Sequence, residues 1–183
     1  SLSALLFSCT DYLDVVPDNL ATIDYAFYDR MGAEKFLTTC YSYLPRFGSY
    51  GSDVSIQGSD EVMIHAQEEV YWLDGFHTYR VIRGQQNVSS PLANFWDGAN
   101  SGINLHQGIR DCNIFLENIN KVGNDLEPTD RTRWISEVKF LKAYYHYYLL
   151  RMYGPVHIIR ENLPMSAGID EVRLYRDPFD EVV

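Results

Sequence analysis

Residues 137–145 read Glu-Val-Lys-Phe-Leu-Lys-Ala-Tyr-Tyr, and residues 153–156 read Tyr-Gly-Pro-Val. Apolar side chains recur through this stretch every three or four residues, which is the spacing of one face of an α-helix. Thr129 or Asp130 offers a side chain that caps a helix start, and Gly154-Pro155 is typical of a helix end. The stretch therefore predicts a helix that ends near 153, with an inward stripe formed by Ile135, Val138, Leu141, Tyr145, Tyr148 or Leu149, and Met152.

Two further helices are predicted before this one. Apolar residues step mostly by three and four over residues 95–121, so a long helix is expected there. The short connection at 123–128 makes this helix and the next one antiparallel neighbours. A third stripe over residues 33–44, between Gly32 and Pro45, predicts a shorter helix.

After the helix that ends near 153, the pattern changes. Residues 156–159 form a brief apolar run that is expected to be extended. Asp177-Pro178 is followed by acidic residues, which is the signature of a helix start. Because this helix is not completed by Val183, we expect residues 33–183 to be the N-terminal part of a larger helical domain.

Between the first two predicted helices, residues 46–92 have no sustained period and are rich in Gly, Ser, Asp and aromatic residues. A long irregular insertion of this kind is usually functional or disordered, and its aromatic residues argue against disorder. Indole faces beside carboxylate, amide and guanidinium groups suit sugars, because the ring covers the C–H face while the polar groups pair with hydroxyls. The alternative is that Trp72 pins the insertion to the helices and that Trp96 opens its helix and faces the core. The candidate ligand-binding residues are Asp60, Glu61, Trp72, Asp74, Arg80 and Trp96.

The composition narrows the classes of function. The chain has 183 residues, 46% of them hydrophobic, and a net charge of −10 at pH 7. This is the composition of a folded chain, and its acidic balance argues against nucleic acid and polybasic membrane contacts. There is no zinc, phosphate-loop or nucleophile-elbow motif, so neither a metal nor a cofactor is predicted. No apolar run reaches the roughly 18 residues of a membrane-spanning helix.

The N-terminal segment carries a lipidation signal. Residues 1–8 read as the last part of a signal peptide, with Leu6 and Ser8 in the positions that a bacterial lipobox requires before its cysteine. We therefore expect residues 1–8 to be a signal-peptide remnant, Cys9 to carry the acyl chains, and residues 9–32 to form a tether. The alternative is a buried Cys9 at the end of a short apolar strand.

The other two cysteines, Cys40 and Cys112, lie on the apolar sides of predicted helices. In an exported protein they could form a disulfide bond. Small buried thiols are the favoured interpretation, because free cysteine packs as a small apolar residue.

Several segments together resemble the SusD/RagB family, the surface nutrient-binding lipoproteins of Bacteroidetes. The strongest is similar to the family's "Glu-x-[Arg/Lys]-Phe-Leu-[Arg/Lys]-Ala … Tyr-Gly-x-Val-Pro" pattern. The others resemble the lipidated start, the first helix, the loop before the second helix, that helix itself, and the start of a later helix. In this chain they are residues 137–145 with 153–156, then 8–17, 33–44, 59–61 with 72–75, 96–117, and 176–182.

The resemblance implies a mainly α fold of tetratricopeptide-like helical hairpins with a long irregular aromatic-rich insertion. It also implies a non-catalytic lipoprotein at the cell outer membrane, exposed at the surface and anchored through acyl chains on Cys9. Such a protein captures an oligosaccharide or peptide and delivers it to a SusC-like TonB-dependent transporter. Two alternatives remain open: a helical-repeat scaffold for protein partners, and a glycan hydrolase that uses loop carboxylates such as Asp60 and Glu61.

Overall fold

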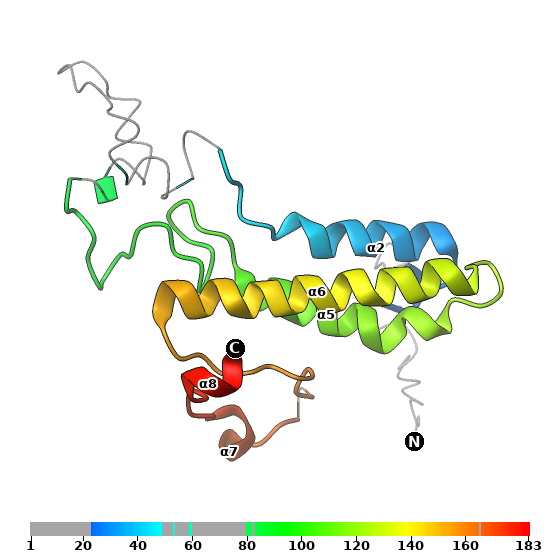
Figure 1. The fold of residues 1–183 in the computed structure, drawn as a ribbon. Helices are drawn as coiled ribbons and strands as arrows, with labels where there is room; N and C mark the ends of the chain where they lie inside the picture. Colours follow the sequence, from blue (N-terminus) through cyan, green and yellow to red (C-terminus); the bar gives the residue numbers. More distant parts are fainter. Residues whose placement is uncertain (1–22, 49–52, 54–58, 60–79, 82, 165) are drawn as a thin grey trace, which may run out of the picture.

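The computed structural model describes residues 23–48, 53, 59, 80–81, 83–164 and 166–183 (Figure 1). Several predictions fall outside these residues. They are the signal remnant at 1–8, most of the tether at 9–32, lipidation of Cys9, and the ligand-binding candidates Asp60, Glu61, Trp72 and Asp74.

Three helices form the body of the described structure: α2 (Arg30–Ser42), α5 (Leu105–Asn118) and α6 (Pro128–Tyr153). Figure 1 shows them side by side, with α5 running antiparallel to both α2 and α6. The short connection between α5 and α6 contains the 3-10 turn Ile119–Lys121. The described residues contain no β-strand. The mainly α prediction and the antiparallel hairpin are therefore confirmed.

The helix α2 begins three residues before the predicted start at residue 33. The Asp29 side chain caps it, since its Oδ1 accepts the backbone N–H of Gly32 at 2.7 Å. Gly32 therefore lies inside the first turn instead of before it. A short helix, α1 (Ile23–Ala26), precedes α2 in a segment for which only a tether was predicted.

The core lies where the three helices meet. Its buried members include Leu37 of α2 and Phe115 of α5. Gly108 of α5 lets the helices approach, because a Cβ added there would lie 2.9 Å from Tyr43 Cβ. The predicted inward stripe of α6 is confirmed except at its end, since Met152 is 42% exposed. The buried members of that stripe are Val138, Leu141, Tyr145 and Leu149.

A hydrogen-bonded cluster joins the end of α2 to α5. The Tyr43 hydroxyl donates to Asp111 Oδ2 at 2.6 Å, and Gln107 Nε2 donates to Asp111 Oδ1 at 2.9 Å. The Asp111 carboxylate is thereby satisfied although the residue is buried. Nearby, the Tyr145 hydroxyl of α6 donates to the backbone carbonyl of Cys40. These bonds fix where the chain leaves α2.

The thiols of Cys40 and Cys112 are buried and unbridged. They contact each other in the core between α2 and α5, and this hydrogen bond together with burial raises the pKa of the Cys40 thiol. A buried thiol with a raised pKa is a poor nucleophile. The predicted packing role of these cysteines is confirmed.

The predicted helix over residues 95–121 is wrong at its start. The helix α5 begins at Leu105, and residues 95–104 form turns. The side chain of Asn104 caps α5, because its Oδ1 accepts the backbone N–H of Gln107 at 2.9 Å. The Asn104 cap fixes the start of α5, and the two glycines before it, Gly98 and Gly102, disfavour a helix over the preceding residues. The apolar spacing of residues 95–104 comes from side chains that fold back onto the core.

After α6, the chain crosses the α5–α6 hairpin and forms two short helices, α7 (Ile169–Val172) and α8 (Phe179–Val182). The predicted helix start near 177 is confirmed by α8. Residues 156–160 are neither helical nor paired as a strand. The Asp177 carboxylate holds this crossing segment together by accepting the Ile158 N–H at 2.6 Å and contacting His157 Nδ1 at 3.0 Å.

His146 attaches the crossing segment to α6. Its Nδ1 lies 2.8 Å from the carbonyl of Lys142, and its Nε2 accepts the N–H of Ile159 at 3.0 Å. Both bonds require a neutral ring with the proton on Nδ1. Burial lowers the pKa of His146 most, the Lys142 carbonyl raises it, and electrostatic interactions with Lys142, His106 and His157 lower it further.

This geometry predicts a loss of stability in mild acid. The folded state holds fewer protons at His146 than the unfolded chain, in which histidine titrates near pH ~6.5, so acid favours unfolding. We expect the unfolding temperature to fall between about pH 7.5 and about pH 5, by about 2–4 °C per kcal/mol lost. In a His146→Gln variant this fall should be smaller, as scanning calorimetry of both proteins would measure. An equal fall in the two proteins would contradict the assignment.

Candidate functional site

Residues 91–104, which we call the Trp96 loop, form a tight system of turns at the end of the three-helix body (Figure 1). Two backbone bonds close its ends: Ala93 N–H donates to Asn100 O at 2.8 Å, and Asn94 N–H donates to Ala99 O at 3.2 Å. A third bond, from Gly98 N–H to Asn94 O at 3.0 Å, closes the turn that carries Trp96. The loop is therefore fixed by its own backbone.

The side chain of Asn94 supports the same turn. Asn94 is buried, and its Oδ1 accepts the backbone N–H of Trp96 at 3.0 Å and that of Asp97 at 3.4 Å. Three non-glycine residues of the loop, Ala93, Asn100 and Ser101, adopt positive φ angles of 47°, 50° and 66°. Such backbone conformations persist only where the surroundings enforce them.

Phe95 attaches the loop to the hydrophobic core. Phe95 is buried and packs against Tyr148 with ring centroids 4.9 Å apart. The N–H of Phe95 donates to the Tyr153 hydroxyl at 2.8 Å, and its carbonyl accepts the N–H of Leu105 at 3.2 Å. The residue before Trp96 is thus attached to both α5 and α6.

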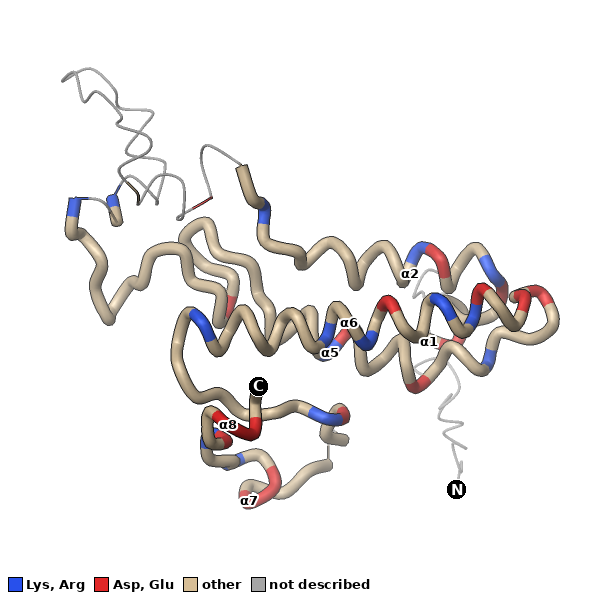
Figure 2. Tube along the Cα trace, viewed as in Figure 1, with Lys and Arg blue, Asp and Glu red and all other residues tan. Residues whose placement is uncertain are grey.

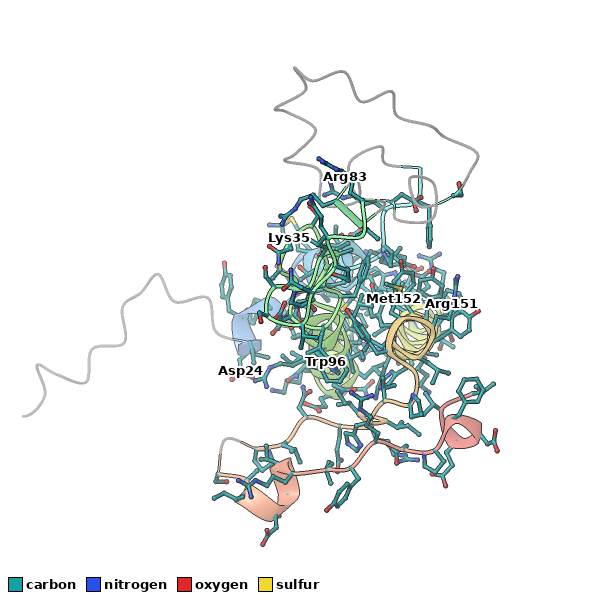
Figure 3. The ribbon with its side chains drawn as sticks, turned by 90° about the vertical axis from the view of Figure 1, so that its left-hand side faces the viewer. Asp24, Lys35, Arg83, Trp96, Arg151 and Met152 are labelled. Carbon is teal, nitrogen blue, oxygen red and sulfur yellow. The ribbon has the colours of Figure 1, made fainter. Side chains whose placement is uncertain are left out.

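Trp96 itself is 40% exposed. Its indole contacts His106 and Tyr153 in edge-to-face arrangements, with ring centroids 4.4 and 5.6 Å away. The Arg176 guanidinium lies over the indole, 5.8 Å from its centroid. Trp96 therefore does not open a helix, and its partly exposed indole also packs against side chains of α5 and α6. Figure 3 shows its position among the side chains that surround it.

Arg80 is the other described candidate, and the structure does not bring it to Trp96. Its Nε donates to Gln85 Oε1 at 3.2 Å. Arg83, from the same turn, lies far from Trp96 in Figure 3. The two predicted candidates that the structure describes therefore belong to separate parts of the surface.

Two hollows flank the Trp96 loop. The first holds about 290 Å³ and lies between the loop, the segment after α2, and Tyr148 of α6. The second holds about 450 Å³ and lies between the start of α5 and the crossing segment after α6. We call them the Phe47 hollow and the Arg110 hollow. His106 belongs to the wall of the second and also contacts the indole of Trp96.

His106 was not predicted as a site residue, and its position explains why. The sequence shows only a polar residue that interrupts the apolar spacing of the helix predicted over 95–121, without a ligand-like spacing. In the structure its Nε2 is buried without a hydrogen-bond partner among the described residues. Burial, and then the nearby His157, lower the pKa of His106. It is therefore a neutral ring between the indole and the Arg110 hollow.

This arrangement suits binding of a ring-shaped polar ligand. An indole held on a rigid turn offers an apolar surface, and amide and guanidinium groups lie beside it. Residues 84–104 carry a single charged side chain, Asp97, whereas charges are frequent on the helices (Figure 2). Among the described residues, no group of three or more His, Cys, Asp or Glu side chains could hold a metal ion. None of the described helices could span a membrane.

A family model described as "Starch-binding associating with outer membrane", of the SusD-like type, matches residues 11–182. No curated protein has a sequence that matches this chain. The family match spans all the described helices and the Trp96 loop. The chain belongs to the SusD-like family of starch-binding proteins associated with the outer membrane.

Proposed function

We propose that this protein is a non-catalytic surface lipoprotein that captures oligosaccharides or other nutrients and delivers them to a SusC-like TonB-dependent transporter. The family match supports carbohydrate binding and association with the outer membrane. The exposed, rigidly held indole of Trp96 carries the proposal for this chain. A preformed aromatic surface binds a sugar ring at little cost in conformational entropy.

Replacing Trp96 is expected to weaken glycan binding. In a Trp96→Ala variant, we expect about tenfold or weaker affinity for maltooligosaccharides, because the surface that covers the sugar C–H groups is lost. Trp96→Phe should retain more affinity than Trp96→Ala. The matched control is Tyr175→Ala, which removes another exposed ring, 93% accessible, outside the loop. Affinity electrophoresis would measure all four proteins, and equal binding by Trp96→Ala and Tyr175→Ala would contradict the assignment.

A separate incubation of the purified protein with glycan tests whether the protein has hydrolase activity. Maltooligosaccharides kept with purified protein should remain intact on thin-layer chromatograms. The appearance of shorter products that scale with protein concentration would instead favour the hydrolase alternative.

The membrane association is proposed to come from lipid on Cys9, since the residues before it read as a lipobox. In cells that process lipoproteins, a palmitate analogue should label the wild-type protein and leave Cys9→Ala unlabelled. Cys40→Ala is the matched control, because this cysteine is buried and should not change labelling. Equal labelling of the wild-type protein and Cys9→Ala would remove the lipoprotein assignment.

A further inference from the structure

The Arg110 hollow has two chemically different walls. Its apolar side is formed by Ile158, Val172 and Leu174, from the crossing segment and the region of α7. Its polar side includes Arg110 of α5 and Arg160 of the crossing segment. The volume of about 450 Å³ lies within the usual range for small-molecule sites. Such a hollow can hold a sugar ring against one wall and a charged substituent against the other.

The guanidinium groups of Arg110 and Arg160 make no hydrogen bond or ion pair in the described structure. Other arginines of the chain are engaged: Arg30 lies 2.9 Å from the Asp130 carboxylate, and Arg131 donates to backbone carbonyls. Two guanidiniums without an ion-pair partner, both on residues that line one hollow, favour an anionic group as its ligand. In a chain with a net charge of −10, this is a local positive site.

The acidic side chains nearby compensate that charge only in part: the Ile158 N–H lowers the pKa of Asp177 most, and the positive charge of Arg160 also lowers it without an ion pair. Asp177 contacts His157 and accepts the N–H of Ile158, so its carboxylate serves the crossing segment. Glu161 also lines the hollow but makes no ion pair with either arginine. The wall of the hollow therefore includes two arginines, Arg110 and Arg160, and one acidic residue, Glu161.

The hollow adjoins the indole of Trp96 through His106, which lines the hollow and contacts the indole at 4.4 Å between centroids. A third guanidinium, that of Arg176, lies over the same indole and donates to the Tyr153 carbonyl at 3.4 Å. A chain of sugar units that stacks on Trp96 would thus meet positive charge at the neighbouring unit. Planar guanidinium groups match carboxylate and sulfate oxygens in bidentate geometry.

We infer that the Arg110 hollow binds the anionic group of an acidic sugar unit, a carboxylate or a sulfate ester, while Trp96 holds an adjacent unit. This inference rests on the proposed capture function and specifies the glycan class that the same site prefers.

The test uses the full-length protein and a double variant, Arg110→Gln with Arg160→Gln. Both substitutions leave in place the backbone bonds of these residues, in which Arg110 O accepts from Asn162 and Arg160 O from Lys142. The matched control is Lys35→Gln with Arg133→Gln, which removes two positive charges from α2 and α6. Calorimetric titrations compare oligogalacturonides, sulfated galactan oligosaccharides and maltooligosaccharides of equal length.

We expect the wild-type protein to bind one of the two anionic glycans more tightly than the neutral one. The double variant should bind that anionic glycan about 10- to 100-fold more weakly than the wild-type protein does. The control variant should bind it less than about twofold more weakly. Preference for the galacturonides or for the sulfated oligosaccharides identifies the anionic group. Equal anionic affinity of the double variant and its control would overturn the inference. Binding of maltooligosaccharides without any anionic preference would also overturn it while leaving the capture function standing, whereas binding of none of the three glycans would overturn both.

Discussion

Arg131→Ala is expected to lower the free energy of unfolding by about 3 kcal/mol, because three backbone carbonyls lose a charged donor. Arg131 Nη1 donates to Ile119 O at 3.0 Å, and Nη2 donates to Val122 O at 2.6 Å and to Gly123 O at 2.9 Å. These carbonyls follow α5, where the last turn of a helix leaves its acceptors without internal partners. A single side chain of α6 therefore terminates α5 and sets the turn of the hairpin.

Chemical denaturation followed by circular dichroism would measure this loss. Arg133→Ala is the matched control, because Arg133 is exposed and contacts only the carboxylates of Asp130 and Glu137 on its own helix. Exposed pairs of this kind contribute about 0.3–0.5 kcal/mol. Arg131→Lys should lie between the two, since an ammonium group cannot reach three carbonyls in the same planar geometry. If Arg131→Ala were no less stable than Arg133→Ala, the capping role would be refuted.

Gly102→Ala is expected to disrupt the Trp96 loop. A Cβ at this position would lie 1.9 Å from the backbone oxygen of Asn94 and 2.2 Å from its carbonyl carbon. The neighbour is backbone and cannot rotate away, so the turn that carries Trp96 must move. Forced displacement of packed groups typically costs about 1–3 kcal/mol. We therefore expect the Gly102→Ala protein to be less stable than the wild-type protein by this amount and to bind glycan as weakly as Trp96→Ala does.

The control for this experiment is Gly123→Ala. A Cβ there meets no atom within 4 Å, so its effect on stability should be small. Tryptophan fluorescence and affinity electrophoresis would follow the loop, and circular dichroism would show that the helices persist. Normal glycan binding by a folded Gly102→Ala protein would show that the loop geometry is unnecessary for binding.

The helices were predictable because their patterns are local. The stripe through Val138 and Leu141 repeats at helical spacing, and Gly154 marks the end of α6. The expected cap at Thr129 or Asp130 is wrong, because α6 begins at Pro128 after Glu127 and has no side-chain cap. Helix starts were harder to predict, because a cap competes with the apolar spacing that precedes it. Asn104 illustrates this: apolar residues before it continue the helical spacing, yet the chain there turns instead.

The candidate site depends on contacts between distant residues, which the sequence does not display. Trp96 was recognised by its chemistry, but its neighbours His106, Tyr153 and Arg176 come from three other segments. The unpaired guanidiniums of the Arg110 hollow are likewise brought together only by the crossing segment. Such sites follow from tertiary packing, and the apolar periods of single helices carry no information about them.

The bonds from Tyr43 to Asp111 and from Gln107 to Asp111 bear on how far the length of the chain between α2 and α5 can change. They bring the end of α2 and the start of α5 together, so the two ends of the connection between these helices are fixed. The entropy of closing a loop grows only with the logarithm of its length, and a doubling costs about 0.6 kcal/mol. The part of this connection that precedes the Trp96 loop can thus change in length at little cost in loop-closure entropy, while the buried residues of the loop stay packed on the helices.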